Sequence, residues 1–224
     1  MKQIGYLYIV ATPIGNYRDI TLRALDVLRE VDAVICEDYR TGSTLLKKLD
    51  IPARELLLLN EHNEKELAAE IAMQMVQGKH YALISDCGTP AFADPGTYLI
   101  QKALEFQVPV IPVPGASSLM ALLSLSPLPV NEFFFAGFPP RQTEARLARL
   151  NSLAKMNVPV VLMDTPYRLE KLLAEVKRAF GRNRTVTLAM DLTLESEKIL
   201  YGSVDEISRQ VGNRKSEFML LIHS

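Results

Sequence analysis

The sequence YALISDCGTPAFADPG, residues 81–96, passes from an apolar run into a loop with two glycines, two prolines and two aspartates. A short run of wholly apolar and aromatic residues is typical of a strand buried on both faces of a parallel sheet. Asp86 follows this run, and open α/β sheets bind ligands at the carboxyl ends of their strands. The segment therefore predicts a ligand loop, although a compact turn with Asp94 capping the next helix is the competing interpretation.

The rest of the first half alternates between the two secondary structures in the same way. Leucines recur at helical spacing between residues 22 and 28, and an apolar face recurs across residues 66–77. We expect strands at residues 6–11, 33–36, 81–84 and 108–113, and helices at residues 66–77 and 97–106. This alternation predicts a largely parallel sheet that is covered by helices on both faces.

The pattern changes after residues 124–130, SLSPLPV, which carry two prolines. Beyond them we expect strands at residues 133–137, 158–163, 185–190, 199–201 and 217–222, with helices at residues 143–155 and 167–180. The sequence therefore predicts two α/β domains, residues 1–118 and residues 119–224, and the second is expected to be smaller, with a mixed sheet.

Composition narrows the function classes. The 224 residues carry a net charge of −1 and no apolar run of the roughly 18 residues that a membrane helix needs. The amino-terminal apolar run lacks a cleavage site and predicts a core strand, not a signal peptide. Cys36, Cys87 and the three histidines show no metal-ligand spacing, so we expect no metal and a reducing cytoplasm.

The distribution of charged residues does not decide whether the protein binds nucleic acid. Tight nucleic-acid binding rests on neutralised phosphates, and this chain has no basic excess overall. Two local groups of cations remain, and solvated helix faces are the favoured interpretation of both. The first group is Arg141, Arg146 and Arg149, and the second is Lys177, Arg178, Arg182 and Arg184.

Three further loops follow expected strands. Residues 11–16, ATPIGN, contain a glycine before a helix but match neither a dinucleotide fingerprint nor a phosphate loop, so a turn is the favoured interpretation. Residues 37–41, EDYRT, suit a site and an exposed loop equally. Residues 114–118, PGASS, offer free amides to a polar ligand group, with Ser117 as a plain helix cap in the competing account. His62 is more simply a loop histidine than a catalytic base.

Taken together, eight blocks resemble the ribosomal RNA small-subunit methyltransferase I family over residues 7–222. In order they are ATPIGNYRDITLRAL, CEDYRTGSTLL, NEHNE, LISDCGTPAFADPG, PVPGASS, FFFAGFPPR, DTPYRL and SEFMLLI. The resemblance implies the two-domain tetrapyrrole-methylase fold, with S-adenosylmethionine in a cleft between the domains, and a homodimer. It also implies methyl transfer to a ribose 2′-hydroxyl of ribosomal RNA.

The resemblance also implies roles for single residues. It places cofactor contacts at Pro13, Asp86, Gly88, Thr89, Ser117, Ser118, Met163, Ala189 and Met190. On the substrate side it suggests Glu37, Arg40 and His62 as catalytic or positioning residues. A carboxylate such as Asp86 could accept hydrogen bonds from the cofactor, and an apolar side chain such as Met163 could cover its adenine.

The chain departs from the family pattern where RNA contacts are expected. Tyr39 replaces a family threonine, and residues 164–168 read DTPYR where the family has ESPHR. Residues 142–144 and 190–194 carry fewer cations than the family, and the sequence stops at Ser224 without the family's helical extension. Methyl transfer is therefore better supported than an RNA acceptor. The alternatives are a methyltransferase of the same fold acting on a small molecule, and a non-catalytic cofactor-binding protein.

Overall fold

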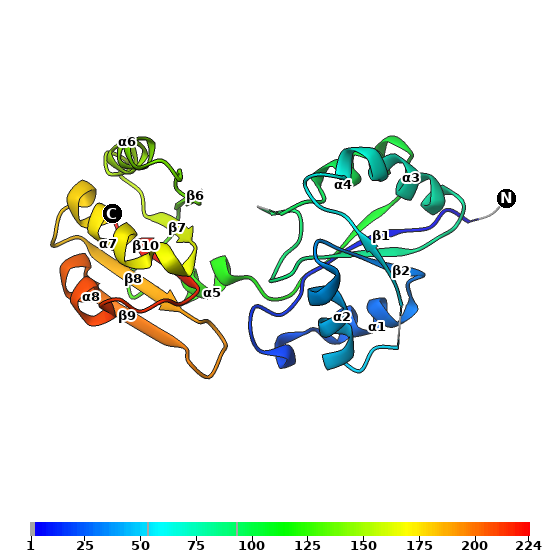
Figure 1. Ribbon diagram of the computed structural model, residues 1–224, viewed down its shortest axis with the longest axis horizontal. Coiled ribbons are helices and arrows are strands. Elements are labelled where there is room, and N and C mark those ends of the chain that lie inside the picture. The colour runs from blue at the N-terminus through cyan, green and yellow to red at the C-terminus, as the bar shows by residue number, and fades with distance from the viewer. Residues whose placement is uncertain (1–2, 53, 93) are drawn as a thin grey trace. The chain divides into compact units, whose positions relative to one another are not determined.

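The computed structural model describes residues 3–52, 54–92 and 94–224. Contacts divide the chain into two compact units, Met1–Ser117 and Ser118–Ser224. We call them the N-terminal unit and the C-terminal unit, and each holds one five-stranded sheet with its own covering helices (Figure 1).

The sheet of the N-terminal unit is parallel throughout. Its strands lie in the order β3-β2-β4-β1-β5. They are β1 (Leu7–Val10), β2 (Ala33–Cys36), β3 (Glu55–Leu58), β4 (Tyr81–Ile84) and β5 (Val110–Val113). Because β4 lies between β2 and β1, the loops that follow these three strands open side by side at one edge of the sheet.

Helices cover both faces of this sheet, as the apolar strands require. α1 (Leu22–Glu30) and α2 (Tyr39–Lys48) pack on one face, whereas α3 (Glu64–Val76) and α4 (Thr97–Glu105) pack on the other (Figure 1). β2 shows the two-residue period, since Val34 and Cys36 join the α1–α2 core while Ala33 and Ile35 join the α3–α4 core. The predicted α/β class is confirmed.

The C-terminal unit has a mixed sheet in the order β6-β7-β10-β8-β9. Its strands are β6 (Phe134–Gly137), β7 (Val160–Asp164), β8 (Thr185–Met190), β9 (Lys198–Ser203) and β10 (Phe218–Ile222). β6 and β7 are parallel, and β10 runs antiparallel to both β7 and β8. β6, β7 and β8 therefore end at the same edge, where β10 begins.

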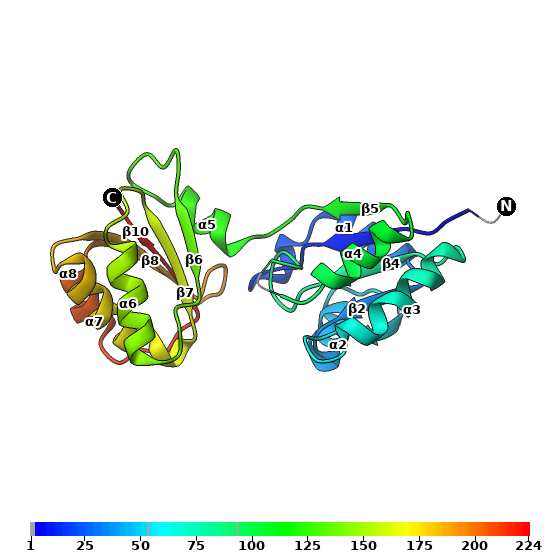
Figure 2. The same cartoon turned by 90° about the horizontal axis from the view of Figure 1, so that it is seen from above.

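The two faces of the mixed sheet are covered unequally. α6 (Thr143–Leu153), α7 (Leu169–Phe180) and α8 (Val204–Val211) pack on one face, and α5 (Ser118–Ser124) packs on the other (Figure 2). Along β10, Phe218, Leu220 and Ile222 enter the larger core, while Met219 and Leu221 enter the core under α5. This alternation explains why a strand that is apolar at every position is fully buried.

The elements α2, β3 and α8 were not expected from the sequence. The presumed loop at residues 37–41 is largely the first turn of α2, with Asp38 as the cap that accepts from the Thr41 N–H at 2.7 Å. β3 is only four residues long, and its two end residues are exposed. α8 begins with a capping box, in which the side chains of Ser203 and Glu206 each accept a hydrogen bond from the other residue's backbone N–H. The S-x-x-E pattern of this capping box was visible in the sequence.

The capping role considered for Asp94 is wrong. Glu64, at the start of α3, accepts from the backbone N–H groups of Gly96, Tyr98 and Leu99 at 3.0, 2.7 and 3.1 Å. One carboxylate oxygen therefore caps α4 from a different helix and complements its positive end. Asp94 instead accepts a hydrogen bond from the Ser85 hydroxyl at 2.6 Å.

The expectation that Arg146 lies on a solvated helix face or in a basic patch is also wrong. Its side chain is 2% exposed, and its Nε lies 2.5 Å from the Glu175 carboxylate, which is 6% exposed. Arg146 also donates to the carbonyl oxygens of Pro140 and Arg141 at 3.1 and 2.7 Å. This buried pair joins α6 to α7 and holds the loop after β6.

Among the described residues, no helix combines the length and the apolar character that crossing a bilayer requires.

Candidate functional site

The loops that follow β1, β4 and β5 meet at the carboxyl edge of the N-terminal sheet. Thr12, in the loop after β1, donates from its hydroxyl to the Ser85 carbonyl at 2.9 Å and from its N–H to the Gly88 carbonyl at 2.8 Å. Thr89, in the loop after β4, donates to the Ala116 carbonyl in the loop after β5 at 3.3 Å. Three loops distant in sequence therefore form one surface.

Two glycines let these loops approach closely. A Cβ on Gly115 would lie 3.1 Å from the Ala11 Cβ, so a side chain there would push two loops apart. Gly88 has a φ of +86° and would bring a Cβ within 3.2 Å of the Ile14 side chain. Both the space and the left-handed backbone at Gly88 require glycine.

A pocket of about 490 Å³ opens in this surface. Its volume falls within the range that holds a nucleoside-sized ligand. The walls come from the loop after β1, the first turns of α2 and the loop after β4, so the pocket brings the predicted residues Pro13, Arg40 and Asp86 together. The lining residues are Pro13, Ile14, Gly15, Tyr17, Arg40, Thr41, Thr44, Leu45, Asp86 and Cys87.

Asp86 gives this pocket a negative character. Partial burial raises the pKa of its carboxyl above the usual value, the neighbouring charge of Asp38 raises it further, and Asp94 adds to the effect. A hydrogen bond from the Asp38 backbone N–H opposes this rise. A carboxylate repelled by its neighbours favours ligands with hydroxyl or amino donors, or with positive charge.

Glu37 is affected by the negative charges of the same acidic residues. Burial raises the pKa of its carboxyl, and the charges of Asp86 and Asp94 raise it further, with smaller effects from Glu61 and Asp38. A carboxylate with a raised pKa takes up a proton more readily than a free one. Among the residues that the structure describes, no three His, Cys, Asp or Glu side chains are arranged to hold a metal ion.

The other predicted residues of the N-terminal unit lie outside the pocket lining. Gly88 and Thr89 belong to the loop after β4, and Ser117 ends the N-terminal unit. His62 is in the turn before α3, with its side chain 84% exposed and its Nε2 3.6 Å from Glu61. The predicted residue Ser118 is the first residue of α5, in the C-terminal unit.

The predicted residues of the C-terminal sheet divide between its two faces. Met163 and Ala189 both pair in register with Met219 and belong to the core under α5. Met190 is fully buried in the core under α7 and α8. Neighbouring residues of a strand alternate between the two faces of the sheet. A ligand on the face that carries Met163 could therefore contact only the backbone of Met190, not its side chain.

Seven residues of the pocket wall were not predicted as site residues. Tyr17, Thr44 and Leu45 lie outside the loops singled out from the sequence, and Ile14, Gly15, Thr41 and Cys87 lie inside them. Thr44 and Leu45 lie one turn after Arg40 and Thr41 on α2, so their position follows once that segment is known to be helical. Cys87 lies inside the loop that supplied Asp86 and could have been included with it. No local signal in the sequence indicates Tyr17.

Comparison with known proteins shows which family the chain belongs to. Residues 6–208 match the family of tetrapyrrole (corrin/porphyrin) methylases. The chain is 39% identical to the ribosomal RNA small subunit methyltransferase I of Xylella fastidiosa, over 99% of this chain and 82% of that protein. It is 37% identical to the protein of the same name from Leptospira biflexa, over 99% of this chain and 92% of that protein.

Solved structures show the same fold at lower identity. A cobalt precorrin-4 methyltransferase of cobalamin biosynthesis aligns with a TM-score of 0.70 and 22% identity, over 97% of this chain and 94% of that chain. The uroporphyrin-III-C-methyltransferase of Thermus thermophilus aligns with a TM-score of 0.67 and 19% identity, over 98% of this chain and 94% of that chain.

Proposed function

Because this chain belongs to the tetrapyrrole methylase family and is a methyltransferase, we propose that it methylates RNA of the small ribosomal subunit with S-adenosylmethionine as donor. One observation carries the choice of acceptor. Relatives named ribosomal RNA small subunit methyltransferase I are 37–39% identical to it over 99% of its length. We further propose that the protein works in the cytoplasm as a homodimer.

The pocket of the N-terminal unit fits the proposed donor. Asp86 would accept hydrogen bonds from hydroxyl or amino groups, and its repelled charge favours a ligand that is positively charged. Gly88 and Gly115 allow the loops around the pocket to pack closely against one another. Pro13, Thr89, Ser117 and Ser118 are proposed as further contacts, with Met163, Ala189 and the backbone of Met190 on the C-terminal sheet. S-adenosylmethionine supplies a methyl group activated by its sulfonium charge.

The chain's own contribution to the chemistry is alignment and proton removal. An acceptor hydroxyl, proposed here to be a ribose 2′-hydroxyl, would lose its proton as its oxygen takes the methyl group from the sulfonium sulfur, which would leave as a neutral thioether. We assign that proton to the Glu37 carboxylate, whose raised pKa suits a base. Arg40, in the pocket wall, would hold a phosphate beside the reacting ribose. His62 is proposed only as an outer substrate contact, because its side chain is 84% exposed.

One edge of the C-terminal sheet offers a surface suited to single-stranded RNA. Phe138 and Tyr167, in the loops after β6 and β7, are 52% and 78% exposed. Lys215, just before β10, places its Nζ 5.0 Å from the centre of the Tyr167 ring. Arg168 ties the two loops together by donating to the Pro139 carbonyl at 3.1 Å. Exposed rings among cations provide stacking platforms for unpaired bases.

A direct test compares small-subunit ribosomal RNA from cells with and without the gene. Mass spectrometry of nucleosides and of nuclease fragments is expected to show one ribose methylation missing in the deletion strain. Purified protein with labelled donor should restore it on that RNA. An identical modification map in the two strains would contradict the proposal.

A methyltransferase acting on a small molecule is the second candidate. The structural neighbours named as cobalt precorrin-4 and uroporphyrin-III methyltransferases favour it, as does the absence of a basic excess in the whole chain. Labelled methyl groups would then appear in a small-molecule extract and not in RNA. The same incorporation assay therefore separates the two acceptors.

The assignment of Glu37 predicts a specific pH profile. A base acts only when it is deprotonated, so kcat/KM should rise with pH through the pKa of Glu37 and then level off. Because burial and neighbouring acids raise the pKa of Glu37, the rise should lie at higher pH than for an ordinary glutamate. Glu37→Gln should lower kcat by about 100-fold and remove this limb of the profile, since general bases contribute about that factor or more.

The matched control for Glu37→Gln is Glu61→Gln, on an exposed side chain that also contributes to the field at Glu37. Glu61→Gln should keep kcat. It should shift the rising part of the kcat/KM profile slightly to lower pH, because it removes one negative charge that raises the pKa of Glu37. An unchanged pH profile in Glu37→Gln would exclude this residue as the base.

A further inference from the structure

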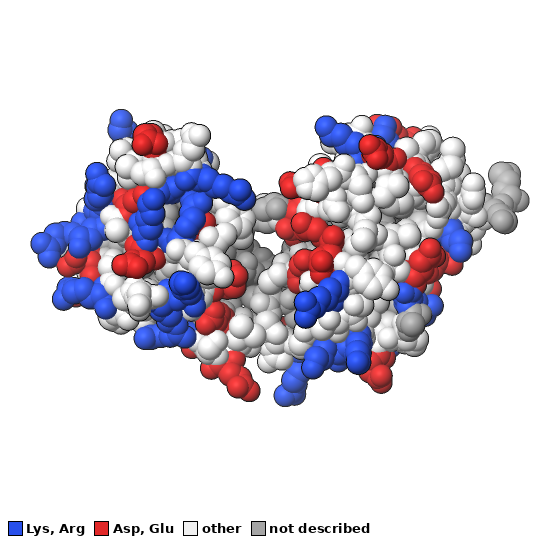
Figure 3. All heavy atoms as spheres, viewed as in Figure 1, with Lys and Arg blue, Asp and Glu red and all other residues white. Residues whose placement is uncertain are grey.

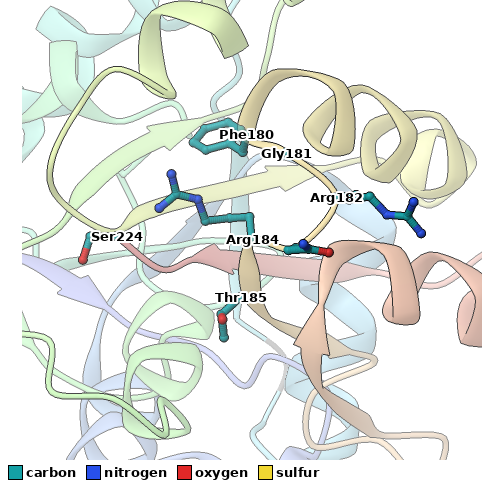
Figure 4. A pocket seen from close by; sticks show the side chains of 7 residues that line it. Phe180, Gly181, Arg182, Arg184, Thr185 and Ser224 are labelled. Atoms are coloured by element: carbon teal, nitrogen blue, oxygen red, sulfur yellow. The ribbon is translucent and has the colours of Figure 1, made fainter.

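A second pocket, of about 530 Å³, lies on the C-terminal unit at the far end of its sheet. It is formed by the loop between α7 and β8 together with Phe180, Thr185 and Ser224 (Figure 4). β8 begins here at Thr185, whereas the proposed cofactor residues Ala189 and Met190 lie at its other end. The pocket is therefore distinct from the edge where methyl transfer is proposed.

Positive charge concentrates around this pocket. Three cations, Lys177, Arg182 and Arg209, contact the carboxylate of Asp205, while Arg184 lines the pocket and Arg178 lies in the last turn of α7. Lys177 pairs with Asp205, and Arg182 and Arg209 lie 3.1 and 3.3 Å from its second oxygen. These hydrogen bonds lower the pKa of Asp205, which therefore stays ionised but can balance only one of the charges.

Arg182 and Arg184 have hydrogen-bond donors that are not used in ion pairs with Asp205. Within the described residues no carboxylate pairs with Arg184, whose guanidinium donates to the His223 carbonyl at 3.2 Å. In the view of Figure 4, the side chains of Arg184 and Arg182 extend in opposite directions from the loop. Arg182 is 71% exposed and uses one of its donors on Asp205. Planar guanidinium groups with free donors match the geometry of phosphate oxygens.

The charge distribution of the whole chain supports this concentration. Residues 118–224 hold 14 Lys and Arg against 11 Asp and Glu, whereas residues 1–117 hold 11 against 15. Lys and Arg side chains are numerous on the visible face of the C-terminal unit (Figure 3). The net charge of −1 is therefore the sum of a basic C-terminal unit and an acidic N-terminal unit, so the overall charge does not argue against contact with RNA.

We propose that this pocket binds backbone phosphates of the RNA substrate, through Arg182 and Arg184 first and through Arg178 and Arg209 beside them. The inference rests on the proposed RNA acceptor and extends it to a contact remote from the reacting ribose. A polymer is favoured over a single nucleotide because the cations continue from the loop onto the last turn of α7 and onto α8. Such contacts fix the position of an RNA without reading its sequence.

The test measures binding of a short single-stranded RNA by fluorescence anisotropy across a series of salt concentrations. For single strands, the slope of log K against log salt is about 0.7 for each phosphate contacted. Arg182→Gln with Arg184→Gln should therefore reduce the slope by about 1.4 and weaken binding about tenfold near physiological salt. Arg182→Lys with Arg184→Lys should restore most of both, because it restores the charge.

The matched control removes two cations elsewhere. Lys47→Gln with Lys48→Gln changes the net charge equally, at exposed positions in the last turn of α2. This control should bind RNA with the wild-type slope. Thermal unfolding and calorimetry with S-adenosylmethionine should be unchanged in all three variants, which separates loss of RNA contact from loss of the fold.

The outcomes are distinguishable. If wild-type protein binds RNA and the Arg182/Arg184 glutamine variant has the same slope, the inference is overturned while the proposed function stands. If wild-type protein binds no RNA, both fail together. If a mononucleotide or inorganic phosphate displaces the RNA at equal phosphate concentration, the pocket is a site for small anions and the RNA assignment is overturned.

Discussion

Asp86→Asn is expected to weaken binding of S-adenosylmethionine by about 100-fold or more. Hydrogen bonds to a charged group contribute about 1.5–3 kcal/mol, and removing the charge also removes the attraction for a positively charged ligand. Asparagine has nearly the same shape, so the pocket wall formed by Asp86 and Cys87 is kept. Isothermal titration calorimetry measures the loss directly.

The same substitution should not destabilise the free protein. Asp86 lies at the surface, and its partial burial together with the charges of Asp38 and Asp94 opposes its ionisation. The Asn side-chain oxygen can still accept from the Asp38 N–H, so the one bond that favours this side chain is retained. We therefore expect a Tm equal to or slightly above that of wild type, with the affinity lost.

Asp50→Asn is the control for the Asp86 experiment. Asp50 is exposed at the end of α2 and has a φ of 52°, a conformation that asparagine tolerates well. It should leave both the affinity and the Tm unchanged. Unaltered affinity in Asp86→Asn would remove this carboxylate from the cofactor site, and a Tm several degrees lower would indicate a structural role instead.

Arg146→Met should lower the free energy of unfolding by about 3–5 kcal/mol, the usual range when one partner of a buried ion pair is removed. Glu175 would then be a buried carboxylate without its cation, since the structure places its oxygens 2.5 and 2.8 Å from Arg146. The carbonyl oxygens of Pro140 and Arg141 would lose a donor as well. Chemical denaturation with urea gives the magnitude.

Two further measurements identify the cause of that loss. Arg146→Met combined with Glu175→Met should recover part of the stability, because apolar pairs of similar volume often replace a buried ion pair. Arg146 lowers the pKa of Glu175, so the pair stabilises the protein above the ordinary glutamate pKa and loses this effect as pH falls through the lowered value.

In Arg146→Met, isolation in the core should raise the pKa of Glu175, and protonation would then relieve the buried charge. The stability gap to wild type should therefore narrow as pH falls from about 7 to about 4. A gap that does not change with pH, or a double variant no more stable than the single one, would contradict the ion-pair explanation.

Local pattern was enough to predict much of this protein. The segments that became β2, β4 and β8 were predicted at the positions where they lie, because a strand buried on both faces is rich in apolar and β-branched residues. The loops that follow the strands were predicted only as candidate ligand loops, because their position along the chain places them at strand ends.

Contacts between distant segments were decided only by the tertiary structure. Pro13, Arg40 and Asp86 share a pocket because β4 lies between β2 and β1, and strand order does not follow from strand positions. Glu64 caps α4 from another helix, and Arg146 is buried because Glu175 meets it from α7. A charged residue shows in sequence only that it is charged. Whether it solvates a surface, caps a helix or pairs in the core depends on which partner the folded chain brings to it.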